Sequence, residues 1–213
     1  MGLVLIGASG LIGSAILREA LARGQQVTAI GRHSERSPSH PNLVPRKGDV
    51  ADEAETAAQI AGHDALISAY NPDKNVPDTY EQHLSSYRAI LHRARPAGVK
   101  RVLVVGGVGS LEVTPGVLFL DTPAFPEAWK TGERANRDVL ALLRAEPDLE
   151  WTCLSPPAMS ESSERTGHFC LGGDQVLTDA DGKSWISVED HAVAMLDEVE
   201  KPQHVRQRFT VGY

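Results

Sequence analysis

The sequence predicts an α/β protein with a doubly wound, mainly parallel β-sheet, helices on both faces and a small C-terminal extension. Three observations indicate this fold. Short apolar runs alternate along the chain with stretches of helical periodicity, and the connections between them are mostly short. The chain has 213 residues, the size of one domain, and its apolar fraction of 41% is enough for one sizeable core.

The N-terminal half shows the alternation most clearly. Residues 3–6 are an apolar run that Gly7 ends, which is typical of a buried strand. Residues 11–23 carry an apolar stripe at helical spacing, and Gly24 follows as a C-terminal cap. The same two patterns predict further strands over 26–30, 43–48, 65–69, 102–105 and 151–154, and further helices over 52–60, 79–95 and 127–144.

Two segments of the chain are less regular. Residues 111–126 contain three prolines and predict a long irregular connection. A mixed region extends over 158–186, with short strands expected near 168–171 and 184–186.

The C-terminus returns to regular structure. Ser187 is placed to cap the last helix, which has acids in its first turn, and residues 208–213 alternate as a terminal strand does. We therefore expect a single domain over 1–213, in which 1–155 form the main α/β unit and 156–213 add a smaller segment.

Charge and composition exclude several classes of protein. The 21 Lys and Arg against 28 Asp and Glu give a net charge of −7, which disfavours nucleic acid as a partner. Two cysteines are too few for a disulfide framework or a zinc cluster, and no HExxH motif or other metal-binding spacing is present. We find no signal peptide and no apolar stretch of membrane-spanning length, so we expect a soluble cytoplasmic protein.

A glycine motif follows the first strand and opens the first helix. It reads Gly7-Ala8-Ser9-Gly10-Leu11-Ile12-Gly13, in the form GxxGxxG. Gly7 permits a tight turn, Gly10 lets the backbone approach a pyrophosphate, and Gly13 lets the helix pack closely on the strand. The helix N-terminus then offers free N–H groups to the phosphates. The motif predicts a dinucleotide site of the Rossmann type; the alternative is a purely structural glycine turn. The predicted contacts are Gly7, Ser9, Gly10, Leu11, Ile12 and Gly13.

The end of the second strand predicts which dinucleotide binds. An NAD site usually carries Asp or Glu at this point, on the ribose 2′-hydroxyl. This chain carries Arg32 instead, and a guanidinium can hold a 2′-phosphate through two hydrogen bonds. NADP(H) is therefore favoured over NAD(H); the alternative is that Arg32 only stacks on adenine and both cofactors bind. The predicted contacts here are Arg32, His33, Ser34 and Arg36.

The ends of the later strands supply the remaining cofactor contacts. Asp49 can accept from the adenine amino group, or it can cap the next helix. Small residues after the fourth strand would let the ribose and the pyrophosphate lie against the backbone. A proline after the sixth strand could form one rigid side of the nicotinamide site. Ser110 is either a donor that polarises the substrate or a turn residue. The full set of further predicted contacts is Asp49, Val50, Ser68, Ala69, Tyr70, Gly106, Gly107 and Pro156.

The chain resembles an atypical short-chain dehydrogenase/reductase, and more narrowly the bacterial NADH-flavin reductase subgroup, relatives of biliverdin reductase B and of NmrA-like proteins. The resemblance covers essentially the whole chain. The segments that carry it are GASGLIGSAILREALARG, KGDVAD, VKRVLVVGGVGSLEV, DTP at 121–123, WTCLSPPA, ERTG at 164–167, SVEDHAVAMLDE and RFTVGY. It implies a Rossmann fold, NAD(P)H binding and hydride transfer to a flavin, quinone or similar acceptor.

One departure from the superfamily pattern bears on the reaction. Where that superfamily has Tyr-x-x-x-Lys, this chain reads Trp129-Lys130-Thr131-Gly132-Glu133. Without a phenol beside a lysine there is no good general acid for ordinary ketones, whereas flavins and quinones need less help from the protein. We therefore expect an NAD(P)H-dependent reductase in which FMN or FAD is a substrate rather than a tightly bound group.

Two other functions stay open at this stage. One is a non-enzymatic, NmrA-like protein that senses NADP(H), and a less favoured one is an NAD-dependent epimerase/dehydratase. For the enzyme, Ser110 and His168 are the candidate catalytic residues; the alternative for His168 is a surface or packing role. Only 111–126 and 156–186 are left to build a substrate pocket, which we expect to be shallow and open. Monomer and homodimer are equally compatible with the sequence.

Overall fold

The computed structural model describes residues 1–32, 34, 37–50, 53–72 and 78–213. In this part of the chain the main sheet has eight strands, which lie side by side in the order β10-β12-β8-β5-β4-β1-β2-β3. β10 runs antiparallel to β12, and the other neighbouring pairs are parallel. The bounds are β1 Gly2–Ile6, β2 Gln26–Gly31, β3 Leu43–Lys47, β4 Ala65–Ser68, β5 Arg101–Val105, β8 Glu150–Ser155, β10 Cys170–Gly172 and β12 Gln207–Gly212.

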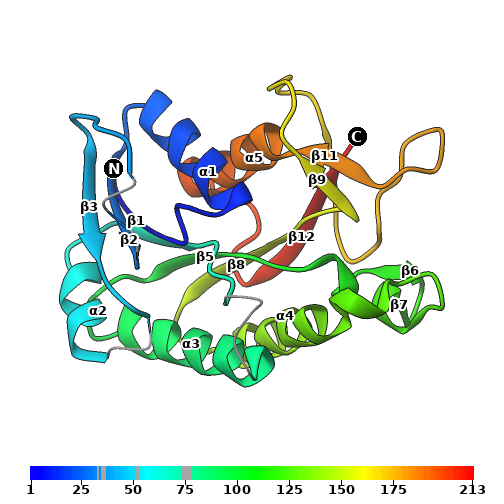
Figure 1. Ribbon diagram of the computed structural model, residues 1–213, viewed down its shortest axis with the longest axis horizontal. Coiled ribbons are helices and arrows are strands. Elements are labelled where there is room, and N and C mark those ends of the chain that lie inside the picture. The colour runs from blue at the N-terminus through cyan, green and yellow to red at the C-terminus, as the bar shows by residue number, and fades with distance from the viewer. Residues whose placement is uncertain (33, 35–36, 51–52, 73–77) are drawn as a thin grey trace.

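Helices cover both faces of this sheet, as Figure 1 shows. On one face lie α1 (Leu11–Ala22) and α5 (Val188–Glu200); on the other lie α2 (Glu53–Ile60), α3 (Thr79–Ala94) and α4 (Lys130–Arg144). The sheet has an apolar core on each side. Leu5 and Ile16 belong to the core under α1 and α5, and Ile90 and Val104 to the core over α3 and α4. The predicted doubly wound α/β fold is therefore confirmed.

Local sequence accounts for several of these boundaries. The Ser187 hydroxyl accepts a hydrogen bond of 3.0 Å from the Asp190 N–H, which confirms the predicted cap of α5. Gly24 has a φ of +74°, a left-handed conformation that ends α1 at the predicted place. The strand predicted at the C-terminus also forms, as β12. Its polar residues Arg208 and Thr210 are buried along with Phe209, because β12 lies between β8 and β10 rather than at an edge.

The connection over 111–126 is more regular than predicted. It contains a small hairpin of β6 (Glu112–Thr114) and β7 (Val117–Leu118), followed by the 3₁₀ helix η3 (Phe119–Asp121). Gly116, with a φ of +80°, allows the tight reversal between the two strands. A separate apolar cluster holds the segment to the fold; its members are Val108, Leu111, Leu120 and Phe125.

The remaining differences lie at element ends and in the mixed region. The 3₁₀ helix η4 (Glu127–Trp129) precedes α4, so the helix predicted from 127 begins three positions later. β9 (Met159–Glu161), which the sequence did not predict, pairs in parallel with β11 (Trp185–Ser187). Among the residues that the structure describes, no helix combines the length and apolar character needed to cross a membrane.

Candidate functional site

The glycine turn after β1 has the geometry that its sequence predicts. Gly7 has a φ of +84°, and a Cβ there would lie 2.5 Å from the Ala69 carbonyl oxygen. A Cβ on Gly13 would lie 2.1 Å from the Gly7 carbonyl oxygen. These two positions exclude any side chain, so the turn and the first turn of α1 are packed directly against each other and against the end of β4.

Gly10 has a different role in the same turn. Its backbone is extended, with φ −75° and ψ 170°, and it precedes α1 without a side chain that could cap the helix. A Cβ there would make only an ordinary contact, 3.5 Å from the Gly7 carbonyl oxygen. Leu11, the first residue of α1, is 57% exposed. No side chain of Gly10 therefore covers the N-terminus of α1, where an anion would meet the positive end of the helix dipole. The predicted contacts Leu11, Ile12 and Gly13, all within the described chain, are not among the lining residues of the cleft described next.

A cleft of about 150 Å³ begins at this turn. It lies at the carboxyl ends of β1, β2, β3 and β4, where connections leave the sheet toward opposite faces. Eight of the predicted contacts line it, namely Gly7, Ser9, Gly10, Arg32, Asp49, Val50, Ala69 and Tyr70. The sequence did not predict six further lining residues, Ile6, Ile30, Gly31, Gly48, Asn71 and Gln82.

The β2 end of the cleft is basic and rich in hydroxyls. Arg32 is exposed there, and the register of β2 and β3 places Lys47 opposite Gly31. Ser34 lines a small adjoining hollow of about 20 Å³, together with Ser9 and Ser37. The predicted contacts His33 and Arg36 fall outside the described residues.

Four other predicted contacts occupy different places. Ser68 is fully buried below the cleft, where its hydroxyl donates to the Tyr87 hydroxyl at 3.3 Å. In the described part of the chain, Gly106, Gly107 and Pro156 are not among the lining residues of the cleft. Gly107 faces α4 instead, since a Cβ there would lie 2.2 Å from Glu133 Oε2.

Ser110 lies in the short 3₁₀ helix η2 (Val108–Ser110) after β5. It is 5% exposed, and its hydroxyl donates to the Gly107 carbonyl oxygen at 3.2 Å. Arg208 of β12 donates a hydrogen bond to the Ser110 carbonyl oxygen at 3.3 Å. In this geometry Ser110 acts as a turn residue, which is the second of the two roles that the sequence allows.

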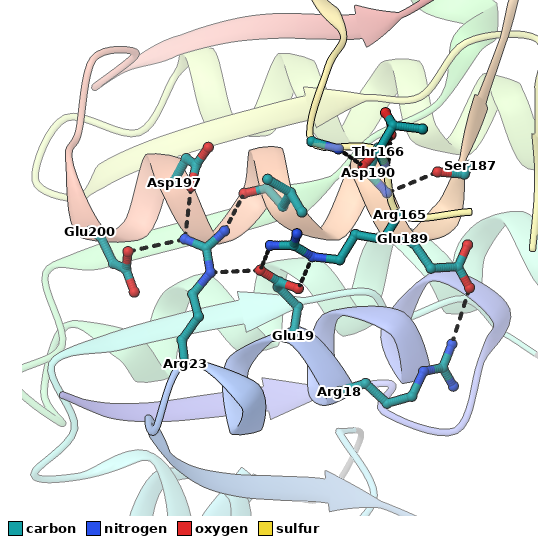
Figure 2. A network of polar contacts seen from close by, with 12 residues as sticks. Arg18, Glu19, Arg23, Arg165, Thr166, Ser187, Glu189, Asp190, Asp197 and Glu200 are labelled. Atoms are coloured by element: carbon teal, nitrogen blue, oxygen red, sulfur yellow. Dashed lines mark hydrogen bonds and ion pairs between the residues drawn. The ribbon is translucent and has the colours of Figure 1, made fainter. Parts of the chain in front are cut away.

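The segment around His168 is tied to α1 and α5, as Figure 2 shows. Arg165 makes two 2.8 Å hydrogen bonds to Glu19 of α1, and the Thr166 hydroxyl donates to Asp190 of α5. Arg23 also bridges the two helices through Glu19 and Asp197. His168 itself is exposed, and among the described residues it is absent from the lining of the cleft and of the cavity described next.

A second, larger cavity of about 470 Å³ adjoins the cleft, with Asn71 in the lining of both. Its walls come from α3, η4, α4 and the loop after β4, and neither 111–126 nor 156–186, two fully described segments that the sequence leaves for a substrate pocket, contributes a lining residue to it. Residues 111–126 pack against Val108 through Leu111, Leu120 and Phe125, whereas Arg165 and Thr166 contact Glu19 of α1 and Asp190 of α5. The lining residues are Asn71, Pro72, Thr79, His83, Ala128, Trp129, Thr131, Gly132, Glu133, Ala135 and Asn136.

Two titratable side chains of this cavity have shifted pKa values. Burial lowers the pKa of His83 to about 4, and the nearby Asn136 side chain opposes this shift only in part. His83 is therefore neutral at pH 7. Burial also raises the pKa of Glu133, although hydrogen bonds from the Gly109 N–H and from Asn136 counteract it.

His83 and Asn136 are not among the residues predicted from the sequence, and Glu133 appears there only as the residue that stands in place of a lysine. A signal was present in the spacing. Trp129, Glu133 and Asn136 are four and three residues apart, which places them on one helical face. That spacing predicts a shared face, but the residue types alone do not say that the face meets the end of β5.

Comparison with known proteins agrees with this geometry. The family model described as NAD(P)H-binding matches residues 7–202. The protein YwnB of Bacillus subtilis (strain 168) is 37% identical over 214 residues, which cover 99% of this chain and 98% of YwnB.

Two solved structures are similar over the whole chain. A "putative epimerase" of Bacteroides thetaiotaomicron is 42% identical with a TM-score of 0.94, covering 100% of this chain and 96% of that one. A "putative NADH-flavin reductase" of Streptococcus pneumoniae TIGR4 is 36% identical with a TM-score of 0.87, covering 100% and 99%. The chain therefore belongs to the NAD(P)H-binding family, with the oxidoreductase-like Rossmann fold of the atypical short-chain dehydrogenases/reductases that its motifs resemble.

Proposed function

We propose that this protein is a reductase that uses NADPH to reduce a flavin, a quinone or a similar planar acceptor by direct hydride transfer. The glycine turn carries the proposal. Gly7 and Gly13 close the turn against the sheet, while Gly10 leaves the N-terminus of α1 open. A diphosphate fits this cradle, because backbone N–H groups and the helix dipole face a cleft at the switch point of the sheet. Bound NADPH would supply the hydride.

The preference for NADPH rests on the β2 end of the cleft. Arg32 is exposed beside it, and Lys47 lies across from Gly31 on β3. Ser9, Ser34 and Ser37 line the adjoining hollow and offer hydroxyl donors. Cationic groups and hydroxyls are the partners that a 2′-phosphate requires, whereas a free ribose 2′-hydroxyl is better matched by a carboxylate.

The choice of acceptor rests on the absent Tyr and Lys. Trp129 and Glu133 occupy that spacing on η4 and α4, and both line the larger cavity. Burial raises the pKa of the Tyr87 hydroxyl, which therefore cannot replace the missing phenol as an acid. A planar, electron-poor acceptor takes a hydride without such a group. The similar Streptococcus pneumoniae protein is described as a putative NADH-flavin reductase, which supports the same class.

The direct test is a steady-state assay. Oxidation of NADPH and of NADH is followed with FMN, FAD and a short-chain quinone as acceptors, against a blank without protein. We expect turnover with at least one of these acceptors and a higher kcat/KM with NADPH. Tight binding of NADP(H) without turnover for any acceptor would instead favour the NmrA-like sensor. Calorimetry with oxidised and reduced cofactor would then measure whether the two forms bind with different affinity.

The substitution Arg32→Asp tests the cofactor preference. It removes a charge-assisted hydrogen-bonding group that contributes about 1.5–3 kcal/mol, which corresponds to roughly 10- to 100-fold in Kd. We expect this loss for NADPH and a change below about threefold for NADH, measured by calorimetry. The control is Arg18→Asp, which makes the same charge change at a side chain that is 60% exposed and pairs with Glu189. Equal losses for both cofactors would show that Arg32 does not contact the 2′-phosphate.

A further inference from the structure

His83 is a buried histidine that has the Asn136 side chain as a polar neighbour. It is 2% exposed, and neither ring nitrogen has a hydrogen-bond partner among the described residues. Its ring packs against Tyr87 at 5.0 Å between centroids, and it lines the larger cavity. A buried polar group that lacks a hydrogen-bond partner is unfavourable, so an apolar ring would be more stable at this position. Because His83 lines the cavity, a ligand bound there could reach the ring.

Glu133 is built into the loop after β5. Its carboxylate accepts from the Gly109 N–H at 2.7 Å and from the Asn136 amide at 3.3 Å. A Cβ on Gly107 would lie 2.2 Å from Glu133 Oε2, and one on Gly109 would lie 2.8 Å from Glu133 Cβ. Both glycines are therefore required for this carboxyl group to reach the end of β5. That strand end is where the nicotinamide is expected to lie in this fold.

Trp129 supplies a flat apolar surface beside these polar groups. It lines the same cavity and is 48% exposed. Asn71 connects the cavity to the cofactor cleft. The volume of about 470 Å³ is within the range of small-molecule sites. A flat ring with hydrogen-bonding groups along its edge matches this combination of an aromatic wall and converging polar side chains.

We propose that this cavity is the acceptor site of the reductase. Trp129 stacks on the acceptor ring, His83 donates a hydrogen bond to a conjugated carbonyl or ring nitrogen, and Glu133 delivers the proton that completes the reduction. This inference rests on the proposed function and deepens it. It assigns the binding site and the proton donor, and it identifies the acceptor by its chemistry as a planar, conjugated carbonyl compound.

Reduction of a quinone or a flavin at this site requires one hydride and one proton. The acceptor gains a hydride from C4 of the reduced nicotinamide, where the C–H bond breaks, and so receives two electrons. The negative charge that develops on its conjugated oxygen or nitrogen is stabilised by the His83 N–H. The O–H bond of protonated Glu133 then breaks as the new O–H or N–H bond forms on the acceptor. Solvent returns a proton to the Glu133 carboxylate.

In the described part of the chain, no ion pair joins a charged group to the Glu133 carboxylate. From α3 it is faced by His83, which is neutral at pH 7, and the loop after β5 contributes the Gly109 N–H. Several charged residues of η4 and α4 have partners of their own: Lys130 contacts Glu127 at 2.6 Å, Arg137 contacts Asp138 at 2.8 Å and Arg144 contacts Asp174 at 3.5 Å. Arg134 of α4 is exposed. Tyr80 of α3 donates to Asp138. The raised pKa of Glu133 therefore follows from burial and extends its protonated form to higher pH.

Glu133→Gln tests the proton transfer, because the amide can still accept from the Gly109 N–H. We expect kcat with the preferred acceptor to fall about 100-fold or more, the range of general acid catalysis, with the KM for NADPH unchanged. The wild-type kcat should decline as pH rises through the raised pKa of Glu133, and the variant should lose this decline. Glu127→Gln is the matched control, since its side chain is 84% exposed and pairs with Lys130.

His83→Phe and Trp129→Ala test the binding of the acceptor. His83→Phe keeps the aromatic packing and removes an unsatisfied polar group, so the fold should be retained or stabilised. Trp129→Ala changes a half-exposed side chain and should also leave the fold intact. We expect each to raise the KM for the acceptor about 3- to 10-fold or more, with little effect on NADPH. Binding of FMN and of menadione, followed by quenching of tryptophan fluorescence, should weaken in parallel for His83→Phe.

The outcomes separate this inference from the proposed function. If wild-type protein reduces an acceptor but the three variants keep its KM, kcat and pH profile, this assignment of the acceptor site is overturned and the reductase stands. If wild-type protein binds NADPH by calorimetry but reduces no acceptor, the proposed function fails. The acceptor site would then survive only if FMN or menadione still binds and His83→Phe weakens that binding.

Discussion

Replacement of Glu198 by alanine should lower the free energy of unfolding by about 3–5 kcal/mol. Glu198 is 4% exposed, and its carboxylate accepts from the Arg101 guanidinium at 2.8 Å and lies 2.8 Å from His204 Nδ1. It also accepts from the backbone N–H groups of Gln203 and His204. The substitution leaves the guanidinium of Arg101, itself 7% exposed, without its carboxylate. An unpaired buried charge is among the most destabilising changes that a single substitution makes.

The measurement is equilibrium unfolding in urea. The free energies of unfolding of wild type and variant are compared with one common value for their dependence on urea concentration. Glu200→Ala is the matched control on the same helix. It removes a carboxylate whose side chain is 33% exposed and pairs with Arg23, so its effect should stay below about 1 kcal/mol. If the two alanine variants unfold at the same urea concentration, the network around Glu198 does not stabilise the fold as argued here.

The same carboxylate gives a pH dependence with a defined sign. Burial alone would raise the pKa of Glu198, but hydrogen bonds from His204 and Gln203 outweigh it and leave this pKa below the ordinary value of 4.5. The unfolded chain therefore binds the proton at higher pH than the folded one does. The stabilisation is fully present above pH 4.5 and is lost as pH falls through the depressed pKa. Glu198→Ala should remove this part of the acid sensitivity.

Gly13→Ala should abolish the measurable binding of NADPH. The new Cβ would lie 2.1 Å from the Gly7 carbonyl oxygen, a backbone atom that cannot rotate away. The turn after β1 must therefore move, which costs roughly 1–3 kcal/mol or more in a packed region. A displaced turn no longer presents the N-terminus of α1 to the diphosphate, so we expect Kd to rise by at least about 100-fold.

Two further alanine variants make this result interpretable. Gly173→Ala is the control, because it is exposed and nothing lies within 4 Å of a Cβ there. Gly10→Ala adds a Cβ at 3.5 Å from the Gly7 carbonyl oxygen, a contact that the fold tolerates. The added methyl group would lie where the phosphates are expected to approach. It should weaken NADPH binding while the melting temperature stays near that of the wild type. Normal binding by both Gly10→Ala and Gly13→Ala would contradict a diphosphate site at this turn.

Much of the fold and half of the site follow from local patterns. The alternation of strand and helix depends on side-chain periodicity, which is a local property, and every strand predicted before residue 155 forms. The glycine turn is also local, since Gly7, Gly10 and Gly13 act within one strand–turn–helix unit. The cleft lined by Arg32, Asp49 and Tyr70 follows from one further rule, that parallel strands end at the same edge.

The doubly wound sheet, the glycine turn and the basic end of the cleft can therefore be predicted from the sequence, because each depends on short-range patterns. The larger cavity and the contacts of the 156–186 segment depend on tertiary packing. His83 and Glu133 are 50 positions apart, and they share a cavity because α3 and α4 pack side by side on one face of the sheet. Arg165 packs against α1 because its guanidinium donates hydrogen bonds to Glu19, which is 146 positions away in the sequence. Contacts between distant segments depend on how whole elements pack, and no local periodicity encodes that choice.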